Sequence, residues 1–284
     1  MVEITGNTFA ESYKQLLDKV YNHYEYETAP RGMNIREIMN CIVRIKNPYS
    51  NLFKNEVRDL PLKYLKKELV LYFAGINDVE MFALASKFWK KIANDDGTIN
   101  SAYGNLIFKM EDSGDQKSQW NWALKQLSKD KDTRQAVLHF NRPIHQYEGV
   151  KDFPCTLEMT FHIRDNKLNA TTVMRSNDVI KGTTFDIPFF MLLQQLMLVS
   201  LKEFYPEIKM GEYTHIAHSM HLYESDFDLV QKMLQHEFIE AETPRLNSER
   251  LPLEGDVEAI ALGKDRSMKY SFNEEFLNWL EKNV

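Results

Sequence analysis

The feature that most constrains the fold is a single apolar run in the second half of the chain. Residues 187–204 read IPFFMLLQQLMLVSLKEF, and charge appears only at the end of this run. A helix that is apolar on every side must lie inside the protein. The run is interrupted by Gln194 and Gln195 and is too short to span a bilayer. We therefore expect a central helix, and a hydrophobic content of 43% is ample for a core around it.

The rest of the chain predicts a single α/β domain over residues 1–284, with a large mixed β-sheet covered by helices. There is no internal repeat, no low-complexity linker and no glycine-rich phosphate-binding motif. Residues 26–34 and 94–104 are predicted loops. Helices are predicted at 9–24, 62–75, 79–93, 118–130, 225–238 and 273–283. Strands are predicted at 38–45, 134–140, 156–165, 167–176 and 213–223.

Charge and cysteine content limit the class of protein. The net charge of -6 makes nucleic-acid binding an unlikely main activity. Only Cys41 and Cys155 are present, which is typical of a reducing, intracellular environment. The N-terminus has no basic-then-apolar signal pattern, so we expect a cytoplasmic protein without a membrane segment.

Cys155 lies in KDFPCTLEM, just after a proline at the start of a predicted strand. A free cysteine is more often an inert buried side chain than a nucleophile. A nucleophilic thiolate needs cations nearby, and Arg31, Arg134, Arg142 and Arg175 all lie in loops or at strand ends. Several arginines in one pocket would also form a phosphate site, whereas each arginine alone is an ordinary surface charge.

Other polar residues also allow two interpretations. Glu68 follows two lysines on a predicted helix, where a surface salt bridge is the usual role. His221 and Tyr223 alternate on a strand and share one face, either as a core pair or as ligands of a sugar. His215, His218 and His221 are three residues apart, so on a strand they face opposite sides and no metal site is expected.

Three segments together resemble the motifs of the thymidylate synthase superfamily, in order and in spacing: PCTLEM, MRSNDVIKGTTFDIP and HSMHLYESD. Further matches are APRG, KKELVLYFAG, FWKKIANDDGTINSAYG and KDTRQAVLHF, so the resemblance runs from about residue 30 to residue 223. It implies a thymidylate synthase-like fold that forms a homodimer through the sheet with shared active sites. It also implies that Cys155 is the nucleophile.

The resemblance further implies that Cys155 attacks carbon 6 of a pyrimidine nucleoside monophosphate. Carbon 5 then captures the one-carbon unit of 5,10-methylenetetrahydrofolate. The implied roles are phosphate binding by Arg31, Arg175, Ser176 and the second subunit's Arg134, sugar binding by His221 and Tyr223, proton transfer by Glu68 and Tyr103, and folate binding by Trp89, Asp178 and Gly182.

Asp186 departs from the synthases, which have an asparagine at this position. A carboxamide complements the edge of uracil, whereas a carboxyl group complements the nitrogen 3 acceptor and the amine of cytosine. The aspartate resembles that of the deoxycytidylate hydroxymethylases of bacteriophages with modified DNA. The alternative role for Asp186 is to cap the following helix.

Other departures point in the same direction. Thr156 and Met174 replace the usual histidine and glutamine, and residues 272–284 do not resemble the apolar tail that excludes water. We therefore predict 5-hydroxymethylation of dCMP, with water as the final nucleophile. Retained Trp89 and the replacement of a second arginine by Gln135 fit this less well.

Several other functions remain open. They are dCMP methylation, a thymidylate synthase or dUMP hydroxymethylase in which Asp186 is only a cap, a CMP substrate, and a non-catalytic or RNA-binding paralogue. The acidic balance and the intact Cys, Glu and Arg set count against the last of these.

Overall fold

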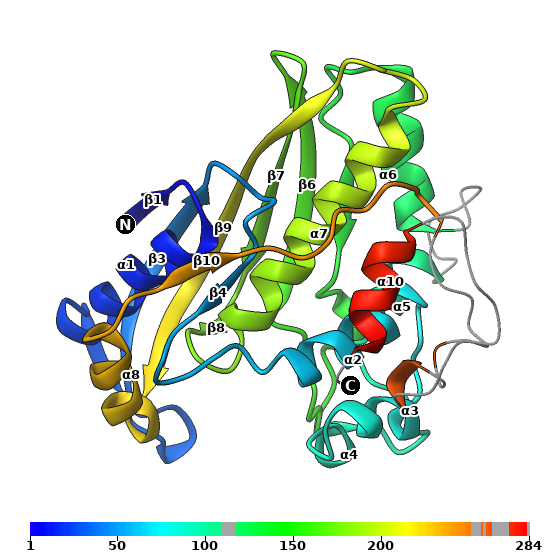
Figure 1. The fold of residues 1–284 in the computed structure, drawn as a ribbon. Helices are drawn as coiled ribbons and strands as arrows, with labels where there is room; N and C mark the ends of the chain where they lie inside the picture. Colours follow the sequence, from blue (N-terminus) through cyan, green and yellow to red (C-terminus); the bar gives the residue numbers. More distant parts are fainter. Residues whose placement is uncertain (110–117, 251–256, 258–259, 263–272, 283–284) are drawn as a thin grey trace.

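The computed structural model describes residues 1–109, 118–250, 257, 260–262 and 273–282. Its centre is one mixed sheet in the strand order β1-β3-β9-β7-β6-β5, with β2 paired to β3 and β8 paired to β9 (Figure 1). Two further short strands, β4 and β10, pair with each other. The strands are β1 Val2–Gly6, β2 Tyr26–Thr28, β3 Ile35–Ile45, β4 Leu52–Lys54, β5 Val137–His139, β6 Thr156–Arg164, β7 Lys167–Met174, β8 Asn177–Asp178, β9 Lys209–Tyr223 and β10 Ile239–Ala241.

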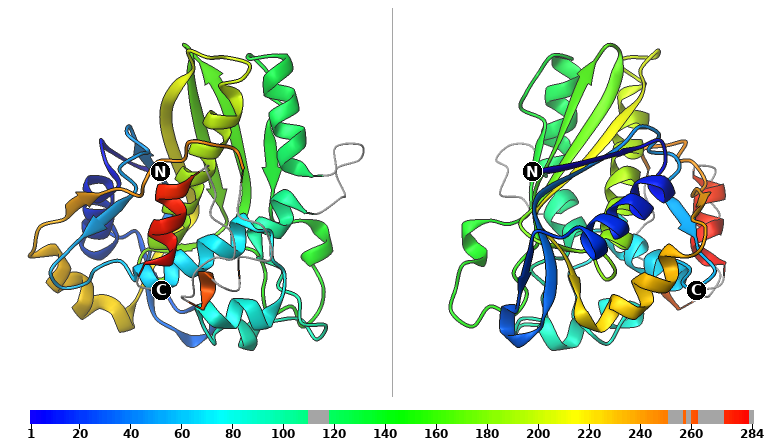
Figure 2. Two further views of the ribbon diagram at one scale, coloured as in Figure 1. Left: turned by 45° about the vertical axis from the view of Figure 1, so that its right-hand side comes forward. Right: turned by 90° about the vertical axis from the view of Figure 1, so that its left-hand side faces the viewer.

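The helices gather on one face of this sheet (Figure 2). The central one is α7, of which nearly every residue is buried. The α-helices are α1 Phe9–Asn22, α2 Leu62–Phe73, α3 Val79–Ala85, α4 Trp89–Ile92, α5 Tyr103–Phe108, α6 Gln119–Lys129, α7 Thr183–Leu201, α8 Phe227–Leu234 and α10 Glu274–Glu281. Short 3-10 turns are η1 Pro30–Gly32, η3 Pro143–His145 and η4 Glu224–Asp226.

The sequence explains why α7 occupies the centre. Among the described residues it is the one helix long and apolar enough to cross a membrane, but 83% of its most apolar window is buried inside the protein. Gln194 is buried in this helix. Its amide nitrogen keeps its hydrogen bonds, because it donates to the backbone oxygens of Leu168 and Glu212. The helix is therefore fixed to strands β7 and β9, as expected for a core element.

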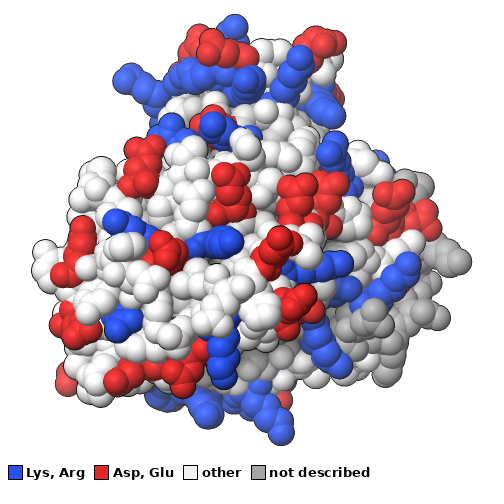
Figure 3. All heavy atoms as spheres, turned by 60° about the vertical axis from the view of Figure 1, so that its left-hand side comes forward, with Lys and Arg blue, Asp and Glu red and all other residues white. Residues whose placement is uncertain are grey.

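The other face of the sheet has a different character. Buried and half-exposed residues alternate along β7 and β9, as a strand with one covered face requires. The half-exposed positions include Val173, Thr214 and Ile216, and the fully exposed His218 lies among them. Figure 3 shows the side of the molecule that carries α1 and α8, where acidic and basic side chains are interspersed.

Some predicted boundaries were wrong. The helix predicted at 79–93 is broken into α3 and α4, because Ser86 has an extended backbone. The helix predicted at 187–204 begins at Thr183, so Asp186 lies within its first turn. The predicted loop 26–34 contains β2, and β1 was not predicted although it pairs in parallel with β3.

The contact between α2 and α5 leaves no space for a side chain at Gly104. A Cβ atom on this residue would lie 1.7 Å from the Tyr72 carbonyl oxygen. Because the obstacle is backbone, α2 and α5 would have to separate. Both helices carry cavity residues, so this close approach fixes one side of the site described below.

We expect Gly104→Ala to lower the free energy of unfolding by about 3 kcal/mol or more, through overpacking at this backbone contact. The control is Gly149→Ala. Gly149 has φ +82°, and a Cβ atom added there would meet no heavy atom within 4 Å. Its substitution therefore measures only the cost of alanine in a left-handed backbone conformation, about 1–2 kcal/mol. Urea denaturation measures both variants, and equal losses would contradict the crowding argument.

Candidate active site

A cavity of about 820 Å³ opens where β3 begins and β7 and β9 end. The helices α2, α4 and α5 and the first turn of α7 form its other walls. It is lined by every predicted site residue except Arg134, namely Arg31, Glu68, Trp89, Tyr103, Cys155, Arg175, Ser176, Asp178, Gly182, Asp186, His221 and Tyr223. Arg134 is exposed just before β5, the edge strand, and Arg142 lines a separate hollow beside that strand.

Glu68 is a buried acid and not the surface salt-bridge residue that its sequence context suggested. Its side chain is 7% exposed, and its Oε1 atom accepts hydrogen bonds from the hydroxyl groups of Tyr64 (2.8 Å) and Tyr72 (3.3 Å). Burial raises the pKa of Glu68 to about 8, and the nearby charge of Asp186 acts in the same direction. Glu68 can therefore hold a proton at neutral pH.

Asp186 does not cap α7, because the helix begins at Thr183 and Gly182 occupies the cap position. Its Oδ2 atom accepts a hydrogen bond of 2.7 Å from the Asn177 amide nitrogen. Burial raises the pKa of Asp186 to about 7, although the bond from Asn177 lowers it. The carboxyl group is thus shared between its acid and its anion near neutral pH.

Gly182 makes room for this contact. A Cβ atom on Gly182 would lie 2.7 Å from the Asn177 amide nitrogen and 3.2 Å from Asp186 Oδ2. Gly182 has a negative φ, so space and not backbone conformation requires glycine here. Its predicted role was folate binding, and the structure adds a second use for it.

Cys155 is half-buried at the start of β6, and its carbonyl oxygen accepts a hydrogen bond from the Arg175 amide. The Arg175 guanidinium donates to the carbonyl oxygens of Pro154 and Phe153, at 3.2 and 2.7 Å. Burial raises the pKa of the Cys155 thiol, while Arg175 and Arg31 lower it. Arg175 therefore holds the cysteine segment in place as well as adding positive charge.

Arg31 reaches the cavity from η1 with a left-handed backbone, at φ 55° and ψ 27°. A non-glycine residue rarely adopts this conformation, and such strain often occurs at functional sites. The Arg31 side chain is exposed, which suits an anion arriving from solvent.

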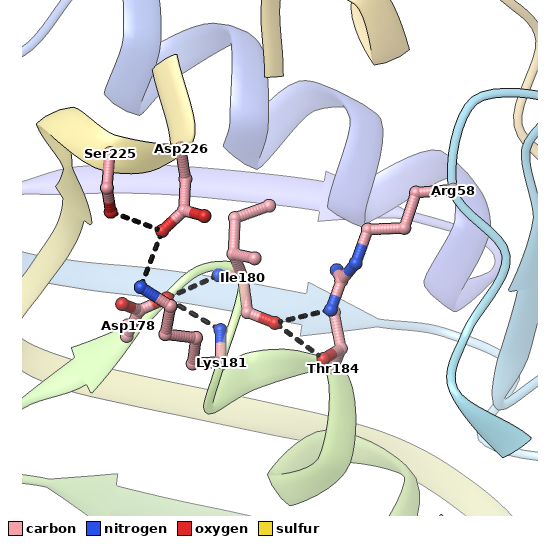
Figure 4. Close-up of polar contacts among 7 residues, drawn as sticks. All are labelled: Arg58, Asp178, Ile180, Lys181, Thr184, Ser225 and Asp226. Carbon is pink, nitrogen blue, oxygen red and sulfur yellow. Dashed lines mark hydrogen bonds and ion pairs between the residues drawn. The ribbon is translucent and has the colours of Figure 1, made fainter. Parts of the chain in front are cut away.

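Asp178 organises the loop between β8 and α7. Its Oδ1 atom accepts from the amides of Ile180 and Lys181, and Lys181 pairs with Asp226 at 2.7 Å (Figure 4). Arg58 donates to the Ile180 carbonyl from the opposite side. The loop is therefore held at both ends, while Asp178 Oδ2 is buried with no partner among the described residues.

An aromatic wall faces this loop. Phe185 and Tyr64 pack edge to face at 4.8 Å, and Phe88 and Trp89 line the same cavity. Trp89 Nε1 is a buried donor with no partner in the described part of the chain. A flat heterocycle with hydrogen-bonding edges, such as the pterin of folate, fits aromatic faces beside an unpaired donor and an unpaired acceptor.

The sugar-binding candidates lie at the end of β9. His221 and Tyr223 point to the same side of the strand, with their rings 5.2 Å apart, and both line the cavity. Within the described residues, no three His, Cys, Asp or Glu side chains gather as metal ligands would. His215 is instead fully buried, and His218 bonds the side chain of Asn40.

Three residues that bond the carboxyl groups of Glu68 and Asp186 were not predicted from the sequence. Tyr64 and Tyr72 lie at four-residue spacing on either side of Glu68, which places all three on one helix face. That spacing was visible in the sequence. Asn177 had no such signal, because its contact with Asp186 depends on how β8 meets the first turn of α7.

Comparison with known proteins agrees with the fold. The thymidylate synthase family model matches residues 11–262. The chain belongs to the thymidylate synthase family. The structure of the thermostable thymidylate synthase A from Bacillus subtilis superposes with a TM-score of 0.66 at 20% identity, over 82% of this chain and 86% of that one. This family membership confirms the predicted superfamily and its mixed sheet packed by helices.

Similar proteins differ in the reactions that their names describe. The deoxycytidylate 5-hydroxymethyltransferase of Enterobacteria phage T6 is 30% identical over 177 residues, 59% of this chain and 70% of that protein. The deoxyuridylate hydroxymethyltransferase of Bacillus phage SP01 is 25% identical over 98% of this chain and 73% of that protein. A putative thymidylate synthase of Methanococcoides burtonii is 25% identical over 82% of this chain and 94% of its own length.

The raised pKa of Asp186, whose side chain is half-buried, predicts a pH-dependent stability of the ligand-free protein. The pKa of Asp186 is about 7 in the folded protein, above the ordinary 3.8. Protonation of Asp186 therefore stabilises the fold in full below about pH 4, and this stabilisation is lost as the pH rises through 7. Asp186→Asn cannot ionise. We expect it to be more stable than wild type at pH 8.5, by about 1–2 kcal/mol after allowance for partial exposure, with a much smaller difference at pH 5.

Urea denaturation at the two pH values measures this difference. Asp95→Asn, which changes an exposed aspartate, serves as the control and should shift neither value. Equal urea midpoints for Asp186→Asn and wild type at pH 8.5 would contradict the burial of this carboxyl group.

Proposed function

We propose that this protein transfers the one-carbon unit of 5,10-methylenetetrahydrofolate to carbon 5 of dCMP and releases 5-hydroxymethyl-dCMP. The observation that carries the proposal is Asp186, an acid where the synthases have an amide, facing the same cavity as Cys155 and Glu68. We further propose that residues 1–284 form one catalytic domain. The reaction would take place in the cytoplasm, which is the host cytoplasm if the chain is viral.

Base recognition follows from the hydrogen-bonding capacity of Asp186. With Oδ2 occupied by Asn177, Oδ1 is left to meet the base. A neutral carboxyl group donates to the nitrogen 3 of cytosine, and its anion accepts from the cytosine amine. Uracil would set its oxygen 4 against the carboxylate instead. A pKa of about 7 makes both forms of Asp186 available during one reaction cycle.

The remaining roles rest on the cavity residues. Cys155 would add to carbon 6, and Arg31, Arg175 and Ser176 would hold the 5′-phosphate. His221 and Tyr223 would bind the sugar hydroxyl. Glu68 would hold and move a proton near the base, together with Tyr103, whose hydroxyl also accepts from the Thr156 amide. Bound folate would supply an electrophilic one-carbon unit, with Trp89 against its ring and Asp178 Oδ2 at its pterin edge.

The C-terminal region supports water as the final nucleophile. Helix α10 packs on α2, and the Lys66 ammonium group donates to the Lys282 carbonyl at 2.6 Å. None of the described residues 273–282 lines the cavity. A site that these described residues leave uncovered admits water to the exocyclic methylene. dCMP methylation is the second candidate, favoured by Trp89, which also lines the cavity.

A direct assay separates these reactions. The protein is incubated with methylenetetrahydrofolate and dCMP, dUMP or CMP, and the product mass and dihydrofolate absorbance are recorded. Hydroxymethyl-dCMP without dihydrofolate supports the proposal. Methylated product with dihydrofolate indicates a methyltransferase, and a preference for dUMP indicates that Asp186 does not read cytosine. Cys155→Ala is the inactive control.

We predict that Asp186→Asn lowers kcat/KM for dCMP and raises it for dUMP, because the amide presents one group that mismatches cytosine. A mismatched buried polar contact costs about 1–3 kcal/mol, which is roughly ten- to a hundredfold in the ratio of the two values. The ratio is measured at a fixed folate concentration. An unchanged ratio would remove Asp186 from base recognition.

We also propose a homodimer formed through the uncovered sheet face, with Arg134 completing the partner's phosphate site. The half-exposed Val173 and Ile216 on that face, and the position of Arg134 outside its own cavity, support this arrangement.

If the sites are shared, mixing inactive Arg134→Ala and Cys155→Ala chains should restore activity, up to about a quarter of the wild-type sites for random pairing of equal amounts. Light scattering establishes the oligomeric state, and each variant mixed with itself is the control. A fully active monomer would contradict the shared site.

A further inference from the structure

A chain of buried polar side chains runs from Asp186 away from the cavity into the sheet. Asn177 donates to Asp186 Oδ2 at 2.7 Å. The Asn177 Oδ1 atom lies 3.1 Å from His215 Nε2, and His215 Nδ1 lies 3.0 Å from the Tyr213 hydroxyl. Asn177 Oδ1 also accepts from Thr183 at 2.6 Å. His215 and Tyr213 are fully buried on β9, and neither lines the cavity.

Donors and acceptors alternate along this chain in one consistent direction. Burial lowers the pKa of His215 to about 3, so its ring is neutral and has one N–H. If Nε2 carries this hydrogen, it donates to Asn177 Oδ1, and Nδ1 accepts from the Tyr213 hydroxyl. The His215 Nε2–H group and the Thr183 hydroxyl then both donate to Asn177 Oδ1. The amide nitrogen of Asn177 must therefore face Asp186.

The opposite orientation of the Asn177 amide is unfavourable at both ends. Its oxygen would meet the Asp186 carboxylate, and its NH₂ group would meet the N–H of His215. An amide on a short side chain is fixed only by such partners, because its two ends have nearly the same shape. Packing alone does not choose between them, so the choice comes from the hydrogen-bond partners, which are Asp186 at one end and His215 and Thr183 at the other.

We propose that His215 is a positioning residue for base selection, which fixes the Asn177 amide so that Asp186 presents Oδ1 to the cytosine edge. This inference rests on the proposed function. His215 touches neither the base nor the cavity, so its effect is transmitted through Asn177. Tyr213 acts one step further away, because His215 Nε2 carries the ring hydrogen when the Tyr213 hydroxyl donates to Nδ1.

A purely structural role for His215 predicts something different. Loss of a buried side chain would then lower stability and reduce activity on every nucleotide alike. A positioning role instead changes the ratio of kcat/KM for dCMP to that for dUMP, because only the group facing the base is altered. Restoring a single N–H donor should also restore that ratio.

The test compares His215→Phe, which keeps an aromatic ring without a donor, with His215→Gln, which keeps an N–H donor. His236→Phe is the control, since His236 is exposed and lies outside the cavity. Steady-state kinetics with dCMP and dUMP at saturating methylenetetrahydrofolate give the ratio, and urea denaturation gives the stability. We expect the ratio to fall about five- to thirtyfold in His215→Phe and to return to within about threefold in His215→Gln.

The outcomes separate this inference from the proposed function. If wild type prefers dCMP and a folded His215→Phe keeps the wild-type ratio, the inference fails and the proposed function stands. If wild type prefers dUMP, the proposed function fails and the inference fails with it. If His215→Phe does not fold, Tyr213→Phe supplies the test. It removes the hydroxyl that pairs with His215 Nδ1 and should lower the ratio about two- to tenfold, and an unchanged ratio overturns the inference.

Discussion

An ionisable carboxyl group at the start of the most apolar helix is the constraint around which this site is arranged. Asp186 needs hydrogen-bond partners because its anion is costly in this environment. Among the described residues Asn177 supplies the hydrogen bond to its side chain, and Gly182 leaves the space for that contact. The loop from Asp178 to Gly182 is in turn held by Lys181 and Arg58 from opposite sides. Removal of any of these supports would leave the carboxyl group free to turn.

A second carboxyl group shares the cavity, and the two differ in their surroundings. Glu68 lies among tyrosine hydroxyls, whereas Asp186 faces an amide. Burial raises the pKa of both groups, the charge of Asp186 raises that of Glu68 further, and the charge of Asp178 raises that of Asp186 further, so neither is fully ionised at neutral pH. Two acids with pKa values close to the working pH can both give and take protons, which covalent chemistry on a pyrimidine ring requires.

The sequence predicted the central helix, five of the six strands in the main order of the sheet and twelve of the residues that line the cavity, because apolar periodicity and local motifs report on them directly. Boundaries were less accurate. The start of α7 was placed after Asp186, since the polar residues Thr183 and Thr184 hide the first turn. The contacts of Asn177 with His215 were not predictable, because they join residues 38 positions apart through strand pairing. The sequence around Glu68 left a surface salt bridge open beside its implied role in proton transfer, and only the folded chain shows that this side of α2 is buried.

Arg175 has a consequence for which molecules this protein modifies. The same guanidinium holds the carbonyls of Phe153 and Pro154, next to Cys155, and faces the cavity where a phosphate is proposed to bind. Anion binding and nucleophile placement then depend on one side chain. A free nucleoside, which offers no phosphate, would meet a cysteine segment without that added restraint. The arrangement would direct the chemistry to monophosphates, and so to the precursor pool before polymerisation instead of finished DNA.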